Sequence, residues 1–148
     1  MKAVFLFSTL FVLAFNCGSS QNMKEKQQDV VFVYEVSSRG FFQQTSISKE
    51  TLVFSEDRTT KQGESYKVSE EDWNMLLGLL NNVEVSEFKN LTSPTNYRAI
   101  DGAAIATFRV KINDEVYQTP MFDNGYPPVE IKNLVEKVVK MGAIVVKS

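Results

Sequence analysis

The sequence contains no histidine and only one cysteine, Cys17. Serine–histidine and cysteine–histidine nucleophile pairs, and metal sites with imidazole ligands, are therefore excluded. A single cysteine has no partner for a disulfide within the chain, so disulfides do not stabilise the fold. The sequence also lacks a glycine-rich loop of the type that holds nucleotide phosphates. These absences remove several common enzyme chemistries.

Excess charge of one sign is also missing. The chain has 16 basic and 18 acidic residues, a net charge of −2, and its basic residues form no continuous block. A protein that binds a nucleic-acid backbone needs a concentrated positive surface to replace the counterions of the phosphates. Nucleic acid is therefore not an expected partner.

Only one long hydrophobic run is present, at the N-terminus. Lys2 supplies a positive charge, and Ala3 to Phe15 form an apolar run that only Ser8-Thr9 interrupts. This run is too short to cross a bilayer as a mature helix, and the pattern is typical of an export signal. Cys17 follows the run almost at once, ahead of the small residues 18–20.

The segment from Met1 to Ser20 resembles a bacterial lipoprotein signal, in which a cysteine directly after the apolar core is acylated and becomes the mature N-terminus. Asn16 stands where such signals usually carry a small residue, a departure that similar signals of Bacteroidota-like bacteria tolerate. The resemblance implies a signal peptide at 1–16, a lipid anchor at Cys17, and a place in the cell envelope at the outer membrane. The alternative is a plain secretory signal cut after Ser20, which would release a soluble secreted protein.

The remaining chain divides into a tether and a domain. Residues 17–29 are small and polar, and we interpret them as a lipid-attached flexible tether. In Bacteroidota-like lipoproteins an acidic run behind the cysteine tends to accompany export to the cell surface, so its absence here favours the periplasmic face. Residues 30–148 suffice for one domain with its own core. This domain resembles small lipoproteins of no characterised family.

The first half of the domain has the composition of a β-sheet, with runs of β-branched and aromatic residues separated by polar segments. Residues 37–40 are predicted to form a turn in which Gly40 supplies a positive φ, and residues 55–64 a loop. The predicted strands are Val30 to Val36, Phe41 to Ile47, Thr51 to Phe54 and the short Ser65 to Val68.

Two helices are predicted from apolar residues spaced at i, i+3, i+4 and i+7. The first begins after Ser69, a suitable N-cap, has three acidic residues in its first turn and ends near Asn81-Asn82. The second follows Pro127-Pro128, which pre-set the chain for a helix. Residues 143–146 are interpreted either as an edge strand or as a frayed tail. The apolar stripes are Trp73, Leu76, Leu77 and Leu80 in the first helix and Ile131, Leu134, Val135 and Val138 in the second.

Between the helices, an irregular segment at 83–91 and a loop at 92–102 lead to a predicted hairpin of Ala103 to Ile112 and Glu115 to Phe122. With Asn113-Asp114 as a two-residue turn, mostly apolar side chains gather on one face. The pairs are Val110 with Tyr117, Phe108 with Thr119, and Ala106 with Met121. The sequence therefore predicts an α+β domain of order ββββαββα, with two helices packed on one face of a single antiparallel sheet.

The same register places Ala104 opposite Asp123, so the loops that enter and leave the hairpin meet at one end of the sheet. Arg98 would then lie among carboxylates and tyrosines. One interpretation is a binding site for a polar ligand or a protein partner. The other is a salt-bridge clip between two loops, with the tyrosines covering the end of the core. The candidate residues are Tyr97, Arg98, Asp101, Asp123 and Tyr126.

The predicted function is non-enzymatic. We expect a membrane-tethered lipoprotein that acts through contact with another envelope protein, as a binding, inhibitory or assembly module. An alternative is a periplasmic carrier that holds a small ligand between helices and sheet, in a cavity lined by phenylalanines that otherwise form plain core. A third is a hydrolase with Asp101 and Asp123 as a carboxylate pair. No metal or cofactor is implied. The phenylalanines are Phe32, Phe42, Phe54, Phe88, Phe108 and Phe122.

Overall fold

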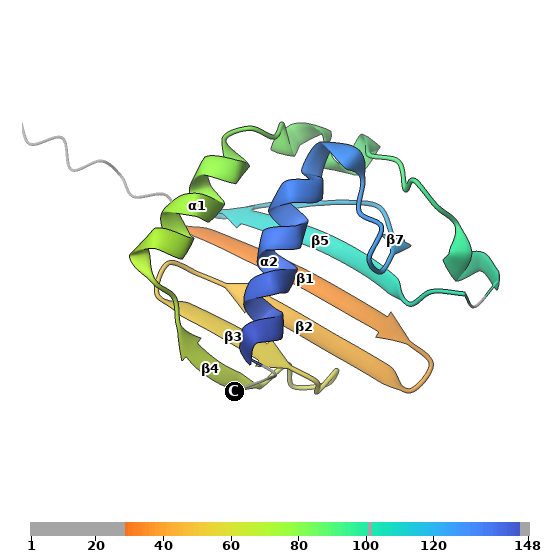
Figure 1. The fold of residues 1–148 in the computed structure, drawn as a ribbon, viewed down its shortest axis with the longest axis horizontal. Coiled ribbons are helices and arrows are strands. Elements are labelled where there is room, and N and C mark those ends of the chain that lie inside the picture. The colour runs from red at the N-terminus through yellow and green to blue at the C-terminus, as the bar shows by residue number, and fades with distance from the viewer. Residues whose placement is uncertain (1–28, 101, 146–148) are drawn as a thin grey trace, which may run out of the picture.

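The computed structural model describes residues 29–100 and 102–145 (Figure 1). The leader, Cys17, the rest of the tether up to residue 28, Asp101 and residues 146–148 lie outside the described residues. Within the described ranges, seven strands form one antiparallel sheet and two α-helices cover one of its faces. The predicted α+β class and the order ββββαββα are confirmed, with the last predicted strand divided into two.

The strands follow the order β4-β3-β2-β1-β5-β6 across the sheet, and β7 pairs with β5 beyond the end of β6. The central strand β1 pairs along almost its whole length with β2 on one side and β5 on the other. The bounds are β1 (Val30–Ser38), β2 (Phe41–Ile47), β3 (Thr51–Ser55), β4 (Glu64–Lys67), β5 (Ile105–Ile112), β6 (Glu115–Gln118) and β7 (Phe122–Asp123).

The core lies between the sheet and the helices α1 (Glu70–Leu80) and α2 (Lys132–Val145). In β1, buried side chains alternate with half-buried ones on the opposite face, because successive residues of a strand point to opposite sides. Both predicted helix stripes face this core, except that Leu77 is only half-buried at its edge. The short 3-10 helices are η1 (Val85–Asn90), which buries Phe88, η2 (Tyr97–Ile100) and η3 (Val129–Ile131).

The ends of α1 follow the predicted signals. The hydroxyl of Ser69 accepts a hydrogen bond from the backbone N–H of Asp72 at 3.1 Å, so Ser69 is the N-cap. Asn81 is the C-cap. The other helix is longer than predicted, because α2 continues to Val145 and neither an edge strand nor a frayed tail begins at residue 143. At this point α2 lies over the middle of the sheet, with Gly142 against Thr45 of β2, and so no sheet edge is within reach.

The hairpin register changes after Thr119. The predicted turn is confirmed, with Asn113 at φ 55° and Val110 paired with Tyr117. Beyond the turn, Pro120 has no N–H to donate, and the pairing resumes one residue later as Ala106 with Phe122 and Ile105 with Asp123. The predicted pairs Ala106 with Met121 and Ala104 with Asp123 are therefore wrong. Phe122 is fully buried, whereas Met121 is 57% exposed.

Candidate functional site

Asp123 is the centre of the predicted cluster. It ends β7, and its side chain is completely buried. The carboxylate accepts four hydrogen bonds, two at each oxygen. Oδ2 accepts from the Thr95 hydroxyl at 2.5 Å and from the backbone N–H of Tyr97 at 2.6 Å. Oδ1 accepts from the backbone N–H and from Nη1 of Arg98, both at 3.0 Å.

These contacts decide the ionisation state of Asp123. Burial by itself raises the pKa of the carboxyl, but hydrogen bonds from Thr95, Arg98 and Tyr97 outweigh burial and hold the pKa well below its usual range. A general acid needs a proton to give near neutral pH, and a nucleophile needs a lone pair that faces the substrate. The carboxylate of Asp123 has neither, so its geometry does not suit the hydrolase interpretation.

Arg98 is held as firmly as the carboxylate. Besides Asp123, its Nη1 donates to the carbonyl of Thr95 at 2.9 Å and to the hydroxyl of Ser93 at 3.2 Å. The side chain is only 24% exposed. The ion pair thus joins the loop before β5 to the end of β7, which is the geometry of the salt-bridge clip.

The two tyrosines differ from the ion pair because they face solvent. Tyr97 and Tyr126 are 48% and 49% exposed, and their rings meet edge to face with centroids 5.6 Å apart. Asp123 holds both backbones, since its carboxylate binds the N–H of Tyr97 and its carbonyl accepts from the N–H of Tyr126 at 2.8 Å. Ile100, 79% exposed, lies in the same 3-10 turn as Tyr97. We call Tyr97, Ile100 and Tyr126 the distal surface.

The structure thus brings together four of the five predicted residues, and the fifth, Asp101, lies outside the described residues. Sequence reasoning missed two supporting hydroxyls, that of Ser93, which accepts from Arg98, and that of Thr95, which donates to Asp123. A Thr-Ser-Pro-Thr stretch is nevertheless a known source of side-chain hydrogen bonds to nearby backbone. It also missed Ile100, because a single apolar residue in a loop carries no periodic signal.

The distal surface lies far from the point where the chain enters the domain. Asp29, just before β1, exchanges hydrogen bonds with Asn113 in the hairpin turn: its carbonyl accepts from the Asn113 N–H at 2.7 Å. From there β1 runs for nine residues, roughly 27 Å, to the end where Ser37 pairs with Ile105. Figure 1 shows η2 and β7 toward this far end of β1, away from its start at Val30.

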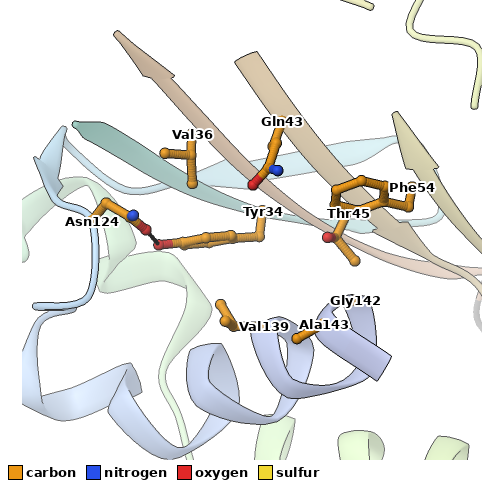
Figure 2. Close-up of a pocket in the computed structure, with 9 residues that line it drawn as sticks. All are labelled: Tyr34, Val36, Gln43, Thr45, Phe54, Asn124, Val139, Gly142 and Ala143. Carbon is orange, nitrogen blue, oxygen red and sulfur yellow. Dashed lines mark hydrogen bonds between the residues drawn. The ribbon is translucent and has the colours of Figure 1, made fainter. Parts of the chain in front are cut away.

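A separate cavity of about 300 Å³ lies between α2 and the sheet (Figure 2). Of the six phenylalanines proposed to line a cavity, only Phe54 does so. Four are buried in the core, and Phe42 points to the opposite face of the sheet, where Arg58 lies over its ring at 5.5 Å. The lining residues are Tyr34, Val36, Gln43, Thr45, Phe54, Asn124, Val139, Gly142 and Ala143.

Comparison with known proteins adds no family to this geometry. No protein-family model, curated protein or solved structure matches the chain. Within residues 29–100 and 102–145, no helix combines the length and apolarity that a membrane span requires. The same residues contain no group of three acidic side chains arranged to hold a metal ion.

Proposed function

We propose that this protein is a membrane-tethered envelope lipoprotein without enzymatic activity, and that it binds another envelope protein through the distal surface. One observation carries the proposal. Two half-exposed tyrosine rings meet at the surface while the backbone beneath them is anchored to the fully buried Asp123.

The composition of the distal surface suits protein recognition. Tyrosine is enriched among residues that dominate binding energy, because its ring offers a large contact area with few rotatable bonds. Ordering a loop on binding has an entropic cost, and here the loop is already held by hydrogen bonds to Asp123. The exposed Ile100 extends the apolar contact beyond the two rings.

The position of the distal surface supports a protein partner over a lipid surface. A tether attached at Cys17 enters the domain beside the Asn113 turn, and the distal surface lies at the other end of β1. The distal surface lies at the end of the domain opposite this point of entry, and we expect that end to meet a second protein. The resemblance of residues 1–20 to a lipoprotein signal supplies the membrane part of the proposal.

The test is site-specific photo-crosslinking in intact cells. Ile100 is replaced by p-benzoylphenylalanine, and the exposed Lys89 of η1 is replaced in a matched control. We expect one discrete crosslinked protein from position 100 that is absent from position 89 and is reduced more than about tenfold by Tyr126→Ala. The same adducts at both positions, or no effect of Tyr126→Ala in a folded variant, would refute the proposal.

A further inference from the structure

The face that α2 turns to the sheet changes along the helix. Its first half fills the core with Leu134, Val135 and Val138. Its last turns place Gly142 directly on the sheet, so close that a Cβ atom there would lie 2.5 Å from the hydroxyl oxygen of Thr45. With Ala143 beside it, this end of α2 has too little side-chain volume to cover the sheet. The cavity opens there, next to the contact between helix and strand (Figure 2).

The walls of the cavity are apolar and hydrogen-bonding but uncharged. Among the described residues that line it, Tyr34 is the only one that titrates, and a tyrosine hydroxyl is neutral at neutral pH. A charged ligand would lose its hydration there without gaining a counter-charge. The apolar part of the wall is formed by Val36, Phe54, Val139 and Ala143.

Two side-chain oxygens in the wall face the cavity. Thr45 is only 6% exposed, and its side chain lines the cavity. Figure 2 shows the side-chain oxygens of Thr45 and Gln43 facing the space beside the Tyr34 ring. The amide nitrogen of Gln43 donates to Glu56 at 3.1 Å, which leaves its oxygen to accept from a ligand.

We infer that this cavity binds a small uncharged ligand with an apolar body and a hydrogen-bonding group. The apolar body lies against Phe54 and the end of α2, and the hydrogen-bonding group meets Thr45 and Gln43. The volume of about 300 Å³ is at the lower end of the range for small-molecule sites, so the ligand is of the size of one or two rings. This site is independent of the distal surface and goes beyond the proposed contact with a protein.

A pair of fluorescent probes tests the inference on the purified protein. N-phenyl-1-naphthylamine is uncharged and has one N–H donor, and 8-anilinonaphthalene-1-sulfonate has the same ring system with an added negative charge. We expect the uncharged probe to bind with increased fluorescence and the sulfonate to bind more than about tenfold more weakly, because the cavity has no cation to pair with it. Equal affinities for the two probes would overturn the inference.

Variants then locate the bound probe. Ala143 is exposed at the rim, so Ala143→Trp fills the cavity without disturbing the core, and Lys140→Trp on the same helix is the matched control. Thr45→Val removes the hydroxyl and keeps the shape. We expect Ala143→Trp to abolish binding, Thr45→Val to weaken it, and Lys140→Trp and Tyr97→Ala to leave it unchanged. Binding that survives Ala143→Trp, or that is lost in Tyr97→Ala, would show that the probe binds elsewhere and would overturn the inference.

Discussion

A buried carboxylate destabilises a fold unless donors replace the water that it loses, and Asp123 has four donors. Replacing such a group by an apolar residue of the same shape is often harmless, whereas leaving its partners unpaired is costly. Asp123 therefore acts by positioning its partners. It fixes where Tyr97 and Arg98 lie relative to β7.

Asp123→Asn tests this role at nearly constant shape. The substitution removes the charge that pairs with Arg98 and places an N–H₂ group against an existing donor. We expect the melting temperature to fall by roughly 10 °C or more, and the amide protons of Tyr97 and Arg98 to exchange faster. Asp114→Asn in the exposed hairpin turn is the control, and an equal effect of the two substitutions would contradict the role of Asp123.

Because Tyr34 is buried, we expect the folded state to lose stability in alkaline solution. Its hydroxyl donates to Asn124 at 2.8 Å, and burial raises its pKa from 10.0 to about 12, partly opposed by the backbone N–H of Gly125. An unfolded tyrosine releases its proton near pH 10, so above that pH the unfolded state binds fewer protons than the folded state. The protonated Tyr34 therefore contributes roughly 2 to 3 kcal/mol to the free energy of unfolding. This contribution is complete below pH 10 and is lost by pH 12.

The measurement is the free energy of unfolding in urea between pH 9 and pH 12. At neutral pH we expect the free energy of unfolding of Tyr34→Phe to be lower by about 1 kcal/mol, because the variant lacks the hydrogen bond to Asn124. Its stability is expected to fall less steeply across the alkaline range than that of the unchanged protein. Parallel curves for the two proteins would show that Tyr34 does not hold its proton in the folded state.

The two helices each contain a glycine, and the space around these glycines differs greatly. Gly78 of α1 is exposed, and a Cβ atom added there meets nothing within 4 Å. At Gly142 of α2 the same atom meets Thr45 Oγ1 at 2.5 Å and Cγ2 at 3.1 Å. Rotating the threonine side chain moves one of these atoms away and not both, so α2 would have to move outward.

Alanine substitutions at the two glycines should therefore change the free energy of unfolding in opposite directions. Gly78→Ala is expected to stabilise the protein by about 1 kcal/mol, the ordinary gain in helix propensity. Gly142→Ala is expected to destabilise it by about 1 to 3 kcal/mol, because overpacking outweighs that gain. Thermal and urea unfolding of both variants provide the check. If both variants were stabilised, α2 would not lie as close to β2 as Gly142 indicates.

The whole molecule has two faces and two ends with different roles. Helices cover one face of the sheet, and the other carries an ionic network in which Glu35 pairs with Lys61 at 3.2 Å and with Arg109 at 3.3 Å. On that face the guanidinium group of Arg58 lies over the ring of Phe42. One end receives the chain at Asp29, and the other presents the distal surface.

Membrane attachment is a property of the whole chain and depends on Cys17 in the proposed function. We expect the protein to fractionate with membranes and the Cys17→Ser variant to be released or to remain unprocessed. Mass spectrometry of the mature N-terminus should find an acylated cysteine. Recovery of the protein in soluble form with an unmodified thiol would instead indicate the secretory alternative.

The regular elements were predictable because their signals are local. The N-cap Ser69, the Asn113-Asp114 turn and the alternating residues of β1 each act within a few positions of the chain. The meeting of Arg98 with Asp123 was also predicted, although from a register that is wrong by one residue. Neighbouring register positions at a strand end still bring the same loops together, so the cluster survived the error.

The sequence alone determined the elements, their order and the end of the sheet at which the candidate residues gather, because short-range periodicity and turn chemistry decide these. Only the tertiary structure decided that Asp123 is buried and saturated while its neighbouring tyrosines face solvent. That outcome depends on the skipped pairing at Pro120, which changes which side chains of β7 point inward. It alone also decided the cavity, because the position of α2 follows from the contact of Gly142 with Thr45, two residues almost a hundred positions apart.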